Sequence, residues 1–173
     1  DLTWAAVLKD YGKGANKTIA KPAGYNALAY YCSTADAPCN AKPYSLGTQK
    51  VLEYGRVKTT DGSLKYMLNW PAFGNDYYIN VVEKKPIERE AYYTAAKNFT
   101  LGFIYFLQTA LKQPQIGFAT DEVNEGMAFM PYNREGRRIK GKVRLNIDHI
   151  ATPFKTNLYR TGISVGDYPV DHH

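Results

Sequence analysis

Three arginines gathered around one glutamate form the first group of side chains in this sequence that could bind an anion. The stretch reads Pro131-Tyr132-Asn133-Arg134-Glu135-Gly136-Arg137-Arg138. A guanidinium group donates paired, planar hydrogen bonds to a carboxylate or a phosphate. The sequence predicts a turn at residues 133–136, with Arg134 and Arg137 beside it. We take these two as candidate substrate-binding residues; the alternative is a solvated turn leading into a basic strand.

A second candidate site is the end of the chain, which reads Gly162-Ile163-Ser164-Val165-Gly166-Asp167-Tyr168-Pro169-Val170-Asp171-His172-His173. Glycines allow the backbone to approach a ligand closely. Asp167, Asp171 and His172 could position a proton donor or acceptor, because histidine titrates near neutral pH. The alternative is a purification tag or a frayed terminus.

A third candidate site combines aromatic rings with amide groups. Its two stretches are Asn69-Trp70-Pro71 and Gly74-Asn75-Asp76-Tyr77-Tyr78. Aromatic rings beside amides suit stacking against a sugar or a planar ring. The alternative is an aromatic loop that packs on a neighbouring helix.

The sequence lacks a self-sufficient catalytic motif. There is no P-loop and no nucleophile elbow, and Gly12-Lys13-Gly14 lacks the third glycine of a dinucleotide fingerprint. With no strand predicted before these glycines, we expect no cradle for a pyrophosphate here. The two cysteines, Cys32 and Cys39, are either free thiols or a small disulfide, and the disulfide would favour a periplasmic or secreted protein. No metal site is predicted, because the three histidines lack metal-ligand spacing.

The elements that must position these residues follow from apolar spacing and from turn residues. A helix over residues 86–111 is the clearest, since Pro86 suits its first turn and Glu88 and Glu90 match its positive end. Its apolar stripe contains Ala91, Ala95, Phe99, Gly102, Phe103, Phe106 and Ala110. The other expected helices cover residues 1–10 and 48–54, and the expected strands cover 65–70, 128–132, 138–146 and 158–165.

This order of elements indicates an α+β fold. We expect an antiparallel or mixed β-sheet with one long helix packed on it, plus a long irregular N-terminal loop at residues 11–47. The predicted domains are residues 1–47, a helix and an extended loop, and residues 48–173, an α+β domain.

Charge and hydropathy limit the partners. The net charge is +6, but the 22 basic residues are interleaved with 16 acidic ones, so no nucleic-acid partner is predicted. The most apolar run, residues 99–111, falls well short of the ~20 residues that a bilayer requires, so no membrane span is predicted.

At the candidate sites the sequence resembles bacterial FAD-dependent oxidoreductases that have a glutathione-reductase-like nucleotide fold. The likeness runs nearly from end to end, and its last two stretches are the most specific. The matching stretches are Asp1-Leu2-Thr3, Leu8-Lys9-Asp10-Tyr11-Gly12, Tyr66-Met67-Leu68-Asn69-Trp70-Pro71, Gly74-Asn75-Asp76-Tyr77-Tyr78, Thr100-Leu101-Gly102-Phe103-Ile104-Tyr105-Phe106-Leu107-Gln108-Thr109, Pro131-Tyr132-Asn133-Arg134-Glu135-Gly136-Arg137-Arg138 and Tyr159-Arg160-Thr161 continuing to His173.

The resemblance implies that this chain is the middle, substrate or cap segment of a larger flavoprotein. The complete protein would pass a hydride from an unknown small-molecule substrate to FAD, and this chain alone would be inactive. Its partner would be the rest of the same polypeptide, which would carry the nucleotide-binding domain.

The same resemblance implies roles for individual residues. Arg134, Arg137, Trp70, Tyr77 and Tyr78 would contact substrate. Near the flavin it places Gly166, Asp167 and Asp171 as cofactor contacts and His172 as the catalytic proton acceptor. The alternative function is a non-catalytic carbohydrate- or ligand-binding module that stacks a ring on Trp70, Tyr77 and Tyr78.

Overall fold

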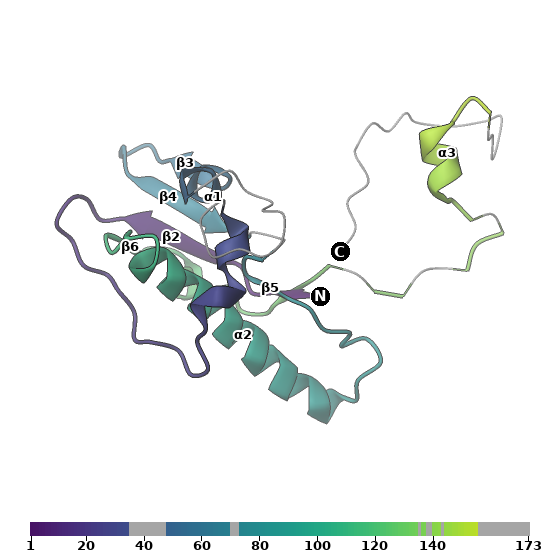
Figure 1. The fold of residues 1–173 in the computed structure, drawn as a ribbon, viewed down its shortest axis with the longest axis horizontal. Coiled ribbons are helices and arrows are strands. Elements are labelled where there is room, and N and C mark those ends of the chain that lie inside the picture. The colour runs from purple at the N-terminus through teal and green to yellow at the C-terminus, as the bar shows by residue number, and fades with distance from the viewer. Residues whose placement is uncertain (35–47, 70–72, 135, 138–139, 143, 156–173) are drawn as a thin grey trace. The chain divides into compact units, whose positions relative to one another are not determined.

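The computed structural model describes residues 1–34, 48–69, 73–134, 136–137, 140–142 and 144–155 (Figure 1). The chain divides into two compact units, Asp1–Arg134 and Glu135–His173. The boundary predicted at residue 47 lies outside the described residues, so it stays a prediction.

The first unit contains a four-stranded antiparallel sheet with the order β3-β4-β2-β6. Its strands are β2 (Ala6–Asp10), β3 (Arg56–Lys58), β4 (Leu64–Leu68) and β6 (Ile116–Phe118). Ala6 pairs with Leu68 and Leu8 pairs with Tyr66. Directly opposed residues project from the same face of a sheet, so these four side chains form one buried face. The strand predicted at residues 65–70 is confirmed as β4 where the structure describes it.

The long helix α2 (Pro86–Thr109) packs on this buried face (Figure 1). Phe103, Phe106 and Leu107 are fully buried in the same core cluster as Leu8 and Tyr66. Burying each such side chain contributes roughly 1.5–3 kcal/mol. The helix therefore joins the chain's middle to its N-terminal strands.

The predicted start of α2 is confirmed. Pro86 occupies the first turn, and the backbone N–H of Lys85 donates to Oε2 of Glu88 at 2.9 Å. The Arg89 guanidinium donates to the carbonyl oxygens of Val81, Val82 and Lys84 at 3.0–3.1 Å. These bonds fix the preceding loop against the helix start.

A second, three-stranded antiparallel sheet has the order β5-β1-β7. Its short strands are β1 (Leu2–Thr3), β5 (Asp76–Tyr77) and β7 (Tyr132–Asn133). Leu2 lies opposite both Tyr77 and Asn133, and Leu2 packs with Ala96 of α2. Thr3 lies opposite both Asp76 and Tyr132. Successive residues of a strand project from opposite faces of the sheet. Leu2 therefore lies on the side that faces α2, and Thr3 and Asp76 lie on the other side.

The N-terminal loop is held by one buried side chain of α2. Gln108 is 3% exposed, and its Nε2 donates to the carbonyl oxygens of Lys17 (2.8 Å) and Ile116 (2.7 Å). Its Oε1 accepts from the backbone N–H of Ile19 at 3.0 Å. Farther along, the loop contains two 3-10 turns, η1 (Ala27–Ala29) and η2 (Tyr31–Ser33).

The predicted α+β class is confirmed, with antiparallel sheets and one long helix, and the short helix α1 (Thr48–Glu53) is also confirmed. The helix predicted at residues 1–10 is wrong, because this segment forms β1 and β2. Its buried apolar residues Leu2, Ala6 and Leu8 are spaced by even numbers, as in a strand.

Two predicted strands are also wrong. In the 128–132 segment, the Ala128 N–H donates to the carbonyl of Ala5 without forming a strand, and β7 begins at Tyr132. The described residues of the 138–146 segment form no strand, and they are exposed. An alternating pattern needs a paired neighbour to become a strand, and no paired strand is described in this unit.

The helix α3 (Ile147–Ala151) follows, with the Asn146 side chain accepting from the Asp148 N–H at 3.1 Å. The strand predicted at 158–165 lies outside the described residues. Among the helices that the structure describes, none combines the length and the apolar character needed to cross a bilayer.

Candidate functional site

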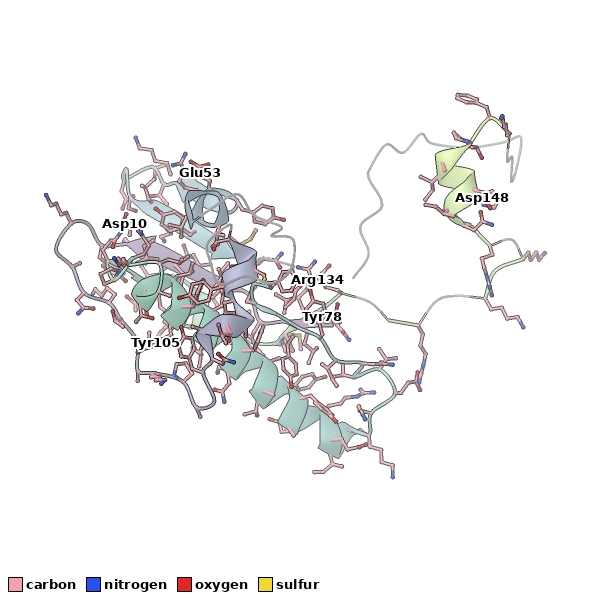
Figure 2. All side chains as sticks on the ribbon, viewed as in Figure 1. Asp10, Glu53, Tyr78, Tyr105, Arg134 and Asp148 are labelled. Carbon is pink, nitrogen blue, oxygen red and sulfur yellow. The ribbon has the colours of Figure 1, made fainter. Side chains whose placement is uncertain are left out.

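A buried polar cluster joins three segments of the first unit around Arg134. Nε of Arg134, a side chain labelled in Figure 2, lies 2.8 Å from Oδ2 of Asp76, and its N–H also donates to Oγ1 of Thr3 at 3.3 Å. Nη2 of Arg134 donates to Oδ1 of Asn69 at 2.8 Å, and the Thr3 hydroxyl donates to Oδ1 of Asp76. The cluster lies on the side of the small sheet that bears Thr3 and Asp76.

Burial makes this ion pair a strong structural constraint. Asp76 is fully buried, and the Arg134 side chain is 11% exposed. A buried charge is tolerated only when it is paired and hydrogen-bonded, so each partner fixes the other. The Arg134 charge is therefore balanced within the fold, and its guanidinium also lies 5.3 Å from the Tyr132 ring centroid. Its predicted contact with substrate stays a prediction.

The backbone of Trp4 connects the two sheets through a second set of polar contacts. Its carbonyl oxygen accepts from Nδ2 of Asn75 at 3.2 Å and from Oγ1 of Thr100 at 3.1 Å. Its indole Nε1 donates to the carbonyl of Ala128 at 2.7 Å. These contacts hold the indole ring in one place.

Beside this ring, on the helix-facing side of the small sheet, lies a pocket of about 270 Å³. We call it the Trp4 pocket. Its lining includes Leu2, Trp4, Glu90, Tyr93, Phe129 and Asn133. Aromatic walls with a few polar groups are typical of small-molecule sites.

Sequence reasoning missed the Trp4 pocket. Its residues come from three distant parts of the chain, near residues 2–4, 90–93 and 129–133. Only long-range pairing of β1 with β7, and packing of α2 beneath them, brings these parts together. The local signal in the sequence is the pair of adjacent apolar residues Phe129 and Met130. The structure leaves them 74% and 73% exposed.

A second pocket, of about 260 Å³, is lined mainly by apolar residues such as Val7, Met67, Val123 and Met127. Its one charged lining residue, Glu122, accepts from Lys65 at 2.6 Å. Lys65 also bonds Asp121, and these hydrogen bonds raise the pKa of Lys65 and lower the pKa of Asp121. The carboxylate of this pocket is therefore already engaged.

The two predicted tyrosines differ in their surroundings. Tyr77 lies with its ring centroid 5.7 Å from that of Phe99 in α2. Tyr78 is 57% exposed (Figure 2). Packing on the long helix, the alternative considered for this loop, accounts for the Tyr77 ring. A role for either residue in substrate binding stays a prediction.

The remaining predicted site residues lie in the second unit or outside the described residues. Arg137 belongs to the second unit and is exposed. The others lie outside the described residues and stay predictions: Trp70, Gly166, Asp167, Asp171 and His172.

The turn at Gly12-Lys13-Gly14 does not fit the pyrophosphate of a dinucleotide. A strand does precede Gly12, contrary to expectation, because β2 ends at Asp10. However, Asp10 Oδ1 accepts from the Gly12 N–H at 2.8 Å, and no helix follows Gly14. A phosphate would meet a carboxylate there and would lack the helix start that usually binds it. Within the described ranges, no group of three or more metal-ligating side chains occurs either.

The structure distinguishes between a free thiol and a disulfide at Cys32. Cys32 is disulfide-bonded, and Cys39, the other cysteine of the sequence, lies outside the described residues. Cys32 is buried in η2, within the N-terminal loop.

Comparison with known proteins gives one family. No curated protein and no solved structure matches the chain. The model of the family described as FAD dependent oxidoreductase matches residues 4–173. Membership in that family implies that the complete protein binds FAD. Because the match covers nearly the whole sequence, the chain belongs to the FAD dependent oxidoreductase family.

Proposed function

We propose that this chain is the substrate-facing cap segment of an FAD-dependent oxidoreductase. The family match over residues 4–173 supports this role, taken with the poor fit of the Gly12-Lys13-Gly14 turn to a pyrophosphate. FAD, held by the rest of the polypeptide, would supply the hydride acceptor for an unknown small-molecule substrate. The chain alone would be inactive.

In this proposal the described residues shape a pocket and exclude water. The Arg134–Asp76 pair fixes the small sheet, and α2 supports its other side. Arg137 and Tyr78 are exposed and remain proposed substrate contacts, as do Arg134, Trp70 and Tyr77. On the strength of the resemblance, Gly166, Asp167 and Asp171 remain proposed flavin contacts, and His172 remains the proposed proton acceptor.

The test is flavin reduction by the complete protein. Bleaching of flavin absorbance under anaerobic conditions identifies a substrate and then gives a rate. His172→Gln should slow reduction by about 10²–10⁴-fold, the usual contribution of general acid–base catalysis. His149→Gln is the matched control, because half-buried His149 accepts from the Asn146 N–H at the start of α3 and is not a proposed site residue, and it should leave the rate unchanged. An unchanged rate in His172→Gln would refute the site assignment.

We also propose that the protein works in an oxidising compartment, as a periplasmic or secreted protein. The disulfide of Cys32 supports this proposal, since structural disulfides persist mainly outside reducing cytosol. Fractionation of the source cells tests it. Recovery of the protein in the cytosolic fraction, with Cys32 reactive toward thiol reagents, would contradict it.

A further inference from the structure

We infer that the Trp4 pocket binds the cationic ammonium group of a small organic ligand. The inference goes beyond the proposed function, because binding to this pocket requires neither flavin nor turnover. It rests on the aromatic and acidic side chains that the fold brings together there.

Aromatic residues form the main walls of the pocket. Trp4, Tyr93 and Phe129 all line it, from three separate segments. The face of an aromatic ring is electronegative and attracts a cation within about 6 Å of the ring centroid. Because Nζ of Lys97 already lies 5.6 Å from the Trp4 ring centroid, we assign the ligand cation to the Tyr93 and Phe129 rings of the lining.

Glu90 is the one charged residue of the pocket lining, and its charge is negative. It lies in the first part of α2 and is exposed. In the described part of the chain no hydrogen bond or ion pair engages the Glu90 carboxylate. By contrast, Glu122 in the apolar pocket is bound to Lys65. Glu90 is therefore available to a ligand.

Charge and size select the class of ligand. An anion would face Glu90 without any basic lining residue to offset it. A neutral sugar would use the hydroxyl of Tyr93 and the amide of Asn133 but would gain nothing from the carboxylate's charge. Because the pocket holds about 270 Å³, just below the range of roughly 300–1,000 Å³ for drug-sized ligands, it fits a small ammonium compound.

Choline and its neutral isostere 3,3-dimethylbutan-1-ol provide a matched pair of probes. They have the same shape and differ in the charge of the central atom. Titration of the full chain, followed by tryptophan fluorescence and calorimetry, should give a millimolar dissociation constant for choline. We expect choline to bind about 5–10-fold more tightly than the neutral isostere, given the usual strength of exposed cation–π and ion-pair contacts.

Two substitutions locate the site. Glu90→Gln should weaken choline binding about 2–5-fold and remove the ion-pair part of the preference over the isostere. Glu125→Gln is the matched control, since Glu125 is an exposed carboxylate outside the pocket lining, and it should bind choline normally. Phe129→Ala removes a ring that is 74% exposed, so the fold should persist while choline binding weakens.

Three results would overturn the inference. Equal affinity for choline and its isostere would show that charge is not recognised. Unchanged choline binding in a folded Glu90→Gln variant would place the cation elsewhere. If choline does not bind even at concentrations far above the millimolar range, or if monosaccharides bind instead, the pocket belongs to another ligand class. None of these results bears on flavin reduction, so the proposed function would stand or fall separately.

Discussion

At the scale of single residues, the buried Arg134–Asp76 ion pair predicts a measurable contribution to folding stability. Arg134→Ala would remove the guanidinium that lies 2.8 Å from the fully buried Asp76 carboxylate, so the free energy of unfolding should fall by about 3–5 kcal/mol. Chemical denaturation of the full chain measures this change. The cost arises from the fold itself and should appear without substrate or flavin.

Arg137→Ala is the natural control for that experiment. Arg137 comes from the same arginine-rich stretch but is exposed, and contacts of exposed charged side chains contribute at most about 1 kcal/mol, so its replacement should change stability by no more than about 1 kcal/mol. Similar, small effects of the two substitutions would mean that the buried pair does not hold the small sheet together.

Close packing of Tyr30 against Gly102 gives a second prediction at this scale. The Tyr30 hydroxyl donates to the carbonyl of Phe99 at 3.0 Å, and a methyl group at position 102 would collide with that hydroxyl. Gly102→Ala should therefore destabilise the protein by about 1–3 kcal/mol through overpacking.

A double-mutant cycle with Tyr30→Phe isolates the collision. Removing the hydroxyl takes away the atom nearest to the added methyl group, so the double variant should lose less stability than the sum of the single variants. Strict additivity, measured by thermal unfolding, would argue against this contact.

At the scale of elements, Gln108 joins α2 to the N-terminal loop and to β6. Its three hydrogen bonds, one buried and two partly buried, serve backbone groups that would lose this partner in Gln108→Leu. We expect a loss of roughly 2–4 kcal/mol, together with faster hydrogen exchange at the Ile19 amide. Thr109→Ala alters the exposed neighbouring residue and should change neither the free energy of unfolding nor hydrogen exchange at the Ile19 amide appreciably. An equal loss of stability in Thr109→Ala would contradict the role of Gln108.

Elements with local signals could be predicted from the sequence, and elements defined by distant pairing could not. The start of α2 follows from Pro86 and Glu88, and the buried Gly102, Phe103 and Phe106 follow from helical spacing. Strand β1, in contrast, is two residues long and exists through pairing with β5 and β7. Local spacing around Leu2 therefore predicted a helix, because its partners lie more than seventy residues away.

The candidate site shows the same division. The Arg134 stretch and the Tyr77-Tyr78 pair were found from residue type alone, since charge and aromatic character are visible in the sequence. That Asp76 pairs with Arg134, or that Glu90 and Trp4 line the same pocket, depends on register between distant strands and on helix packing. Neither relation has a local sequence signal.

At the scale of the whole molecule, buried tyrosines predict alkaline instability. Burial raises the pKa of Tyr25, Tyr30 and Tyr66 above the usual value of 10.0. Above about pH 10 the unfolded chain releases these protons while the folded protein retains them, so stability is full below that pH and falls as pH rises.

Thermal unfolding with parallel phenolate absorbance measures this effect between about pH 9 and pH 11. Part of the tyrosine titration should coincide with unfolding, and Tyr30→Phe should flatten the fall in stability. Ionisation of all 15 tyrosines with the fold intact would contradict the burial of these rings.

The central claim, that this chain is the cap segment of a flavoprotein, is tested most directly on the native gene product. An antibody against this chain should capture it from the source cells for measurement of mass and flavin absorbance. The account predicts a species well above 19.5 kDa that carries bound FAD. A flavin-free species that matches 19.5 kDa would contradict the account and would favour a ligand-binding module instead.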